Sequence, residues 1–209
     1  MIFDMDGVLM NTEALHYAIW KEVFAECGLT IDFDHYKGCI GSNNTRLMQL
    51  IYEGYGVDFR NDDTIIQRFF QRKWEHVALH GVPPIEGVPQ TLAQLKAEGY
   101  RIAVASSSPK KSIEVCLQSL DIHHFFEVLF STEQVARPKP APDVFLAAAT
   151  ALGADPGICT VVEDSRNGTL AAKAAGMHCI GFVNPDSGDQ DLSAADVLIH
   201  RFGELLNLL

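Results

Sequence analysis

The sequence is poor in the features that mark disulfide-rich proteins and membrane proteins. Its five cysteines are an odd number and form no C-x-x-C pair, which argues against a disulfide framework or a structural zinc site. No run approaches the roughly 20 apolar residues that a membrane-spanning helix needs. Carboxylates near the N-terminus also interrupt the apolar core that a signal peptide would require.

The chain also has few basic residues for its size. It carries 16 lysines and arginines against 27 aspartates and glutamates, which gives a formal net charge of −11. Such a protein repels a phosphate-rich nucleic acid or an anionic membrane at long range. We therefore expect a soluble, cytoplasmic protein with reduced cysteines and with neither a nucleic-acid nor a membrane partner.

The second half of the chain has a clear strand pattern. From about residue 100, short apolar runs alternate with helical patterns, which is typical of βα units around a parallel sheet. Met1 to Phe3 form a further apolar run, which is short for a strand. We predict an α/β fold with helices on both faces of a parallel sheet. The later predicted strands are Ile102–Ala105, Val128–Phe130, Cys159–Val162, Cys179–Val183 and Val197–Ile199.

The interval from residue 12 to residue 79 has a different pattern. Apolar residues recur there at spacings of three and four, as in Leu15, Ile19 and Val23, and no strand run interrupts them. We predict an all-helical insert that lies as a cap over the strand ends, with Gly81–Pro84 as the return linker. The predicted domains are an α/β core of residues 1–11 and 80–209 and a helical cap of residues 12–79.

Two pairs of carboxylates follow predicted strands. Asp4 and Asp6 stand directly after the first apolar run and before a glycine, and Glu163 and Asp164 end a later run. Ligands of open parallel sheets bind at this edge. Two carboxylates about 4 Å apart repel by roughly 4 kcal/mol at an effective dielectric of 20, so the group requires a cation. Oxygen ligands of this kind suit Mg²⁺.

A hydroxyl and a lysine accompany these acids. Ser106 ends a predicted strand, and Lys139 lies between two prolines. Ser108 and Ser107 are available as the N-cap of the next helix, with Pro109 at its first position, which leaves Ser106 free to bind phosphate. A lone D-x-D-G sequence is often a turn, so the combination of motifs, and not one of them, indicates catalysis.

These four motifs, in this order, resemble those of the haloacid dehalogenase-like hydrolases. The resemblance covers nearly the whole chain and implies a Rossmann-like core with a helical cap. It is closest to the branch of β-phosphoglucomutase and the sugar-phosphate phosphatases, whose pattern Asn11–His16 and Trp20 also resemble. The motifs are D-x-D-G-V from Asp4, the strand-end Ser106, K-P-x-P-D from Lys139 and E-D-S from Glu163.

The resemblance implies a role for each motif residue. Asp4 would attack the phosphoryl group and form an aspartyl-phosphate. Asp6 would protonate the leaving alkoxide and later deprotonate the attacking water. Ser106 and Lys139 would hold the phosphoryl oxygens.

The resemblance also implies a Mg²⁺ site. The ligands would be the Asp4 carboxylate, the Asp6 backbone carbonyl and Asp164, with Glu163 binding directly or through a water molecule. Four carboxylates against one lysine leave the site too negative without a metal. We therefore expect a chelator to abolish the activity.

Residues of the cap and of the serine loop are candidates for substrate contact. His16 is as often a core or interface residue as a substrate contact, and Ser107 is a further candidate beside Ser106. Trp20 fits the cap core by its helical spacing. For three other cations, surface ion pairs are the commoner role: Arg46, Lys73 and Lys110.

A phosphatase acting on a small phosphorylated molecule, a sugar or polyol phosphate, is the predicted function. The mutases that the chain resembles need cations for a second phosphate, and one of these is an arginine in a helix start that begins with glycine. Here that helix start reads Gly41–Thr45, and Arg46 comes two places later than the mutase arginine. The run Ser106–Pro109 instead resembles hexose- and polyol-phosphate phosphatases. β-Phosphoglucomutase is the alternative. A receiver-like phospho-binding switch fits less well, because it needs neither a cap nor Asp6. We expect a monomer.

Overall fold

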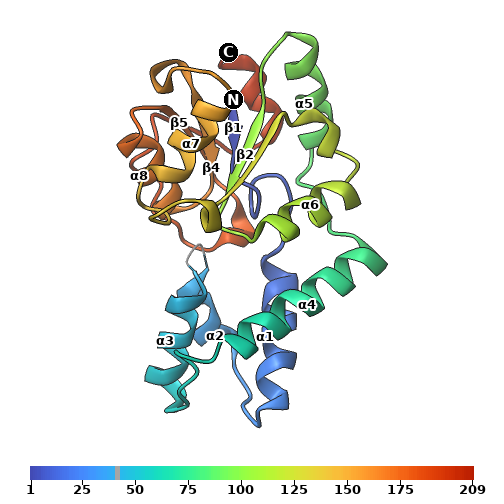
Figure 1. Cartoon of the computed structure of the whole chain (residues 1–209), viewed down its shortest axis with the longest axis vertical. Helices are drawn as coiled ribbons and strands as arrows, with labels where there is room; N and C mark the ends of the chain where they lie inside the picture. Colours follow the sequence, from blue (N-terminus) through green and yellow to red (C-terminus); the bar gives the residue numbers. More distant parts are fainter. Residues whose placement is uncertain (41–42) are drawn as a thin grey trace.

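A parallel sheet of six strands forms the centre of the larger part of the protein (Figure 1). The structure is a computed structural model that describes residues 1–40 and 43–209. The later strands match the predicted ones to within one residue at each end, and the α/β fold is confirmed. The strands are β1 (Ile2–Phe3), β2 (Ala103–Ser106), β3 (Val128–Ser131), β4 (Thr160–Glu163), β5 (His178–Phe182) and β6 (Val197–Ile199).

The strand order places the start of the chain in the middle of the sheet. The order is β3-β2-β1-β4-β5-β6, and each neighbouring pair is parallel. The direction of winding reverses between β1 and β4, and ligands of open α/β sheets bind beyond the carboxyl ends of the strands at such a point. Asp4 follows β1 and Asp164 follows β4, so both residues lie at this point.

Helices cover both faces of the sheet. Successive strand residues point to opposite faces, and here both faces carry apolar side chains that the helices bury. Phe3 packs in an apolar cluster with residues of α5 (Val88–Ala97) and α6 (Lys110–Ser119). Its neighbour Ile2 packs in a second cluster with residues of α7 (Asp143–Ala151) and α8 (Arg166–Ala174). Short 3₁₀ helices complete the secondary structure: Lys37–Cys39, His123–Phe125, Thr132–Gln134, Pro156–Ile158, Pro185–Ser187 and Phe202–Asn207.

A group of helices with its own apolar core lies beyond one edge of the sheet (Figure 1). Within the described part of residues 12–79 there is no strand, as predicted. Trp20 lies in the core of this group, where its ring stacks on Phe69 with 4.3 Å between the ring centroids. The helices are α1 (Glu13–Glu26), α2 (Phe33–Tyr36), α3 (Asn44–Tyr55) and α4 (Asp63–His80).

The two segments that connect the helical group to the sheet run side by side. The Asn11 amide donates to the Pro83 carbonyl at 3.0 Å, and the Ile85 amide donates to the Leu9 carbonyl at 3.2 Å. Helix α4 takes part in both apolar clusters, because Phe69 packs in the helical group while Val77 packs beside the sheet. The division into residues 1–11 and 80–209 against residues 12–79 stays a prediction.

Among the described residues, no helix is both long and apolar enough to cross a membrane.

The predicted start of α6 was wrong by one residue. Pro109 is the N-cap residue, with an extended ψ of 145°, and the helix begins at Lys110. The proline provides no side-chain cap, and the Lys110 amide instead donates to Glu133 Oε2 at 3.1 Å. Ser108 lies one residue before the N-cap, and its hydroxyl donates to the Asp6 carboxylate at 2.7 Å. The serine that the sequence assigns to the helix therefore belongs to the candidate site.

Candidate active site

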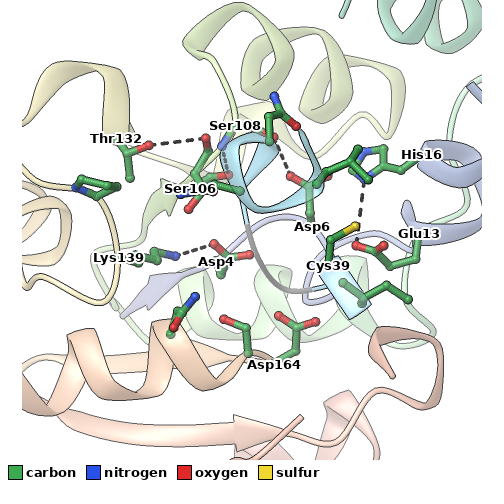
Figure 2. Close-up of a pocket in the computed structure, with 18 of the residues that line it drawn as sticks. Asp4, Asp6, Glu13, His16, Cys39, Ser106, Ser108, Thr132, Lys139 and Asp164 are labelled. Carbon is green, nitrogen blue, oxygen red and sulfur yellow. Dashed lines mark hydrogen bonds and ion pairs between the residues drawn. The ribbon is translucent and has the colours of Figure 1, made fainter. Parts of the chain in front are cut away.

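A cavity of about 210 Å³ lies between the carboxyl edge of the sheet and the helices of the cap. Figure 2 shows that Asp4, Asp164 and Lys139 approach it from the core, whereas Glu13, His16 and Cys39 approach it from the other side. We call these two sides the core wall and the cap wall. The predicted site residues all line this cavity: Asp4, Asp6, His16, Ser106, Ser107, Lys139, Glu163 and Asp164.

Lys139 holds the core wall together. Its ammonium donates to Asp4 Oδ1 at 2.6 Å, to Glu163 Oε1 at 2.7 Å and to the carbonyl of Ala105 at 3.0 Å. Burial would lower the pKa of Lys139, but the Asp4 and Glu163 carboxylates outweigh burial and raise it. The lysine therefore stays charged inside the protein.

Asp4 is buried at the end of β1 beside this lysine. Burial raises the pKa of Asp4 to about 7; the nearby Lys139 works against this rise, and the Glu163 charge adds to it. The carboxylate form of Asp4, which a nucleophile requires, thus depends on neighbouring positive charge.

Two glycines make room for the acids that follow β4. A Cβ on Gly168 would lie 1.7 Å from the Glu163 carboxyl, and a Cβ on Gly7 would lie 1.9 Å from Asp164 Oδ2. Gly7 also has a φ of +83°, which favours glycine. The last position of the D-x-D-G motif therefore needs its glycine both for the turn and for the close approach of Asp164.

The donor set fits a metal that takes few protein ligands. In residues 1–40 and 43–209, no three histidine, cysteine, aspartate or glutamate side chains are grouped to hold a metal. Both oxygens of Glu163 are engaged, because Oε1 accepts from Lys139 and Oε2 accepts from Ser165. The remaining acids are Asp4 and Asp164, and burial together with the Glu163 and Asp4 charges raises the pKa of Asp164 well above its usual value. A cation beside these two acids would offset that charge, and Mg²⁺ commonly binds one or two carboxylates with waters and phosphate.

Asp6 lies between the two walls and has three donors. It accepts from Ser108 at 2.7 Å, from Thr12 at 2.7 Å and from the Lys73 ammonium at 3.1 Å. Burial by itself would raise the pKa of Asp6, but Lys73 and the two hydroxyls outweigh it and hold the pKa well below its usual range. Asp6 is therefore ionised in this arrangement.

Lys73 is a site residue that our sequence analysis assigned to the surface, and that interpretation was wrong. Its side chain is 0% exposed and pairs with Asp6. The signal was present in the sequence, because Ile65, Phe69, Lys73 and Val77 recur every four residues and all are buried. A lysine in the middle of an apolar helical stripe indicates a buried partner.

His16 is buried in the cap wall between two acids. Its Nε2 lies 3.6 Å from Asp6 Oδ1 and its Nδ1 lies 3.9 Å from Glu13 Oε1. Within the described part of the chain, Nε2 has no hydrogen-bond partner. Burial lowers the pKa of His16 to about 3, so the imidazole is neutral. A role in substrate contact stays a prediction for His16.

The other predicted residues differ in how closely they approach the cavity. Ser106 and Ser107 line it, and Ser106 Oγ accepts from the Ser108 amide at 3.0 Å. Arg46 and Lys110 are exposed and are not among the described lining residues. Gly41 and Ser42, on which part of the comparison with mutases rests, lie outside the described residues.

Glu13 is a lining residue that our sequence analysis did not single out. It begins α1, and its Oε2 accepts from the Tyr36 hydroxyl at 3.3 Å. Burial, followed by the Asp6 charge, raises the pKa of Glu13 to about 7. An acid in the first turn of a helix is common because the helix dipole favours it, so Glu13 did not stand out within the segment Asn11–His16.

Residues 1–182 match the family described as haloacid dehalogenase-like hydrolase. The chain belongs to this family. It is 32% identical to hexitol phosphatase B of Escherichia coli over 98% of this chain and 92% of that protein. It is 28% identical to β-phosphoglucomutase of Bacillus subtilis over 98% of this chain and 90% of that protein. It spans only 17% of a longer Arabidopsis thaliana relative, Suppressor of Quenching 1, at 32% identity.

Solved structures agree with this assignment. The fold resembles that of CbbY from Rhodobacter sphaeroides in complex with phosphate, with a TM-score of 0.88 and 26% identity over 98% of this chain and 94% of that one. A second structure of a mutant of that protein, with xylulose-1,5-bisphosphate, has a TM-score of 0.86 at the same identity and coverage. The chain is therefore an enzyme of the phosphatase type, in the branch that holds sugar phosphatases and β-phosphoglucomutase. Hydrolases of this family generally use a divalent metal.

Proposed function

We propose that this chain is a Mg²⁺-dependent phosphatase that hydrolyses a small phosphomonoester, a sugar or polyol phosphate. The observation that carries the proposal is the buried Lys139 ammonium between Asp4 and Glu163, at the point where the strand order reverses. A carboxylate that attacks a phosphate dianion brings like charges together, and a fixed cation offsets them. A relative named hexitol phosphatase B supports the substrate class.

The proposed reaction has two steps, each of which uses Asp4 and Asp6. In the first, an Asp4 oxygen bonds to phosphorus while the bond from phosphorus to the leaving oxygen breaks, and Asp6 gives that oxygen a proton. In the second, water attacks the phosphorus of the aspartyl-phosphate and gives a proton to Asp6, while the bond from phosphorus to the Asp4 oxygen breaks. Inorganic phosphate leaves, and both aspartates return to their starting forms.

The contacts of Asp6 favour the second step. Lys73, Ser108 and Thr12 stabilise the carboxylate, which is the form that accepts a proton from water. The first step needs the protonated form. An arriving phosphate dianion works in that direction, because a nearby negative charge raises the pKa of a carboxyl group.

The proposed Mg²⁺ site uses Asp4, Asp164 and the backbone carbonyl of Asp6. Glu163 would act through a water molecule, since its oxygens are taken by Lys139 and Ser165. When bound, the metal supplies positive charge to the phosphoryl oxygens and to the acids around them. Ser106 and Lys139 hold the same oxygens from the other side.

The charges of the cavity favour hydrolysis over phosphosugar isomerisation. A mutase of this branch must also hold a second phosphate. Among the described lining residues the lysines are Lys73 and Lys139, and each is already paired with a carboxylate. β-Phosphoglucomutase stays the second candidate because of the relative of that name.

The test is turnover of a panel of hexose and hexitol phosphates with Mg²⁺, including β-glucose 1-phosphate with a trace of bisphosphate. Free phosphate and isomerised sugar phosphate are both measured, with Asp4→Asn and excess EDTA as controls. We expect many turnovers of phosphate release that both controls abolish. Isomerisation without phosphate release would identify a mutase, and a single phosphorylation without turnover would identify a receiver-like switch.

A further inference from the structure

The cap wall contains an acid that the proposed chemistry does not use. Glu13 lines the cavity with its side chain 16% exposed. One of its oxygens accepts from the Tyr36 hydroxyl, whereas the other, Oε1, accepts no hydrogen bond from the described residues and has His16 Nδ1 at 3.9 Å. A carboxylate oxygen is thus available at the cavity surface.

The position of Glu13 follows from the residues between it and Asp6. The His16 ring contacts both acids, with Nε2 toward Asp6 and Nδ1 toward Glu13. The leaving oxygen of the substrate must lie beside Asp6, which protonates it. A leaving group that extends from there into the cap wall meets His16 and Glu13, which Figure 2 shows on that side of Asp6.

The helical group lines the cavity with apolar side chains and with uncharged polar ones. The polar ones include Tyr36, Asn43 and Asn44, and His16 is neutral. The two lining lysines are paired with Asp6 on one side and with Asp4 and Glu163 on the other. Amides and hydroxyls of this kind bind hydroxyl groups in either direction. A second phosphate placed here would meet a carboxylate and, among the described lining residues, no unpaired lysine.

We propose that Glu13 determines specificity by accepting a hydrogen bond from a hydroxyl group of the leaving group. The enzyme then selects monophosphates of hydroxylated, otherwise uncharged molecules and discriminates against bisphosphates. The inference rests on the proposed phosphatase function and adds a substrate class to it.

The experiment compares Glu13→Ala and Glu13→Gln with the wild type on three substrates at about pH 8, where Glu13, with a pKa of about 7, is ionised. These are the best hexose or hexitol monophosphate of the panel, p-nitrophenyl phosphate, which has no hydroxyl chain, and fructose 1,6-bisphosphate. Glu22→Gln is the matched control, because Glu22 lies on the same helix but is exposed and pairs with Arg72 outside the cavity. Thermal melting checks that each variant is folded, and Glu13→Gln keeps the shape of the side chain.

We expect Glu13→Ala to lower kcat/KM for the monophosphate by about 10- to 100-fold, mainly through KM, because a hydrogen bond to a charged group is lost. The loss with p-nitrophenyl phosphate is smaller. In both variants the kcat/KM ratio of bisphosphate to monophosphate rises about fivefold or more, because a like charge is removed. Glu22→Gln leaves all three substrates at wild-type values.

Two other results would overturn the inference while leaving the phosphatase in place. One is an equal loss on all three substrates, which indicates a structural role for Glu13. The other is a wild-type preference for the bisphosphate or an unchanged selectivity in both variants. Absence of phosphate release from any substrate by the wild type would instead refute the proposed function itself.

Discussion

The two walls of the cavity each contribute a buried lysine, and the two lysines differ in what surrounds them. Lys139, in the core wall, is 4% exposed and donates to two carboxylates and a backbone carbonyl. Lys73, which reaches in from α4, is 0% exposed and donates to one carboxylate, that of Asp6. The partners of Lys139 stand at or beside the ends of β1, β2 and β4, whereas Lys73 lies on α4 and pairs with Asp6 in the loop after β1.

The two lysines therefore depend on different parts of the fold. The hydrogen bonds of Lys139 all lie within the sheet and the loop that carries it. Asp6 depends in addition on α4, a helix that also packs in the core of the cap. We therefore expect changes in the core wall to affect stability and catalysis most, and changes in the cap wall to affect them less.

The largest effect is expected for Lys139→Met, which leaves Asp4 and Glu163 buried together without a cation. Removing one partner of a buried ion pair costs about 3–5 kcal/mol of unfolding free energy. The loss of a phosphate-binding cation should lower kcat/KM by about 10³-fold. Urea denaturation and steady-state kinetics measure the two effects. An unfolding free energy within about 1 kcal/mol of the wild type would contradict the role of Lys139 as the centre of the core wall.

The same difference between the walls decided what the sequence could predict. Core-wall residues directly follow strand runs or, like Lys139, stand between prolines, and short-range patterns are sufficient to find them. Their meeting point follows from the parallel order of the strands. The fold class and Asp4, Ser106, Lys139 and Asp164 were therefore all within reach of the sequence.

Cap-wall residues come together through helix packing, which no local pattern fixes. Glu13 is an ordinary acid at a helix start, and only the packing of α1 over the sheet turns it into a cavity residue. Ser108 was assigned to a helix cap, but its hydroxyl donates to Asp6, which is 102 residues away in the chain. Lys73 was the exception, since its place in an apolar stripe was readable and was missed.

The second prediction concerns the pH dependence of stability and tests Glu13, an acid of the cap wall. The pKa of Glu13 is about 7 in the folded protein, against 4.5 for the same side chain without the fold. Above pH 4.5 the unfolded chain has lost the Glu13 proton while the folded protein still binds it, so the stability falls as pH rises. The contribution of Glu13 is fully present at low pH and is lost as pH rises from about 4.5 to about 7. Glu13→Gln cannot ionise, so its stability relative to the wild type should increase by up to about 3 kcal/mol across this window.

Urea denaturation of both proteins with EDTA, at about pH 5 and about pH 8, measures this change. Glu22→Gln is again the control, because Glu22 is exposed and lies outside the cavity. If Glu13→Gln differs from the wild type by the same amount at both pH values, the Glu13 carboxyl is not buried in a way that opposes its charge.

The smallest effect is expected for Lys73→Met, which tests the weaker half of the comparison. Asp6 keeps Ser108 and Thr12 as donors and remains partly accessible to solvent, so the cost should be about 2 kcal/mol, less than for Lys139→Met. The rate should fall by about 10- to 100-fold, because Asp6 loses the cation that fixes its position as general acid and base. Lys21→Met on the exposed surface of α1 is the matched control for charge and length. A loss of stability equal to that of Lys139→Met would mean that the two walls form one charge network, in which the cap is as necessary to the fold of the site as the sheet.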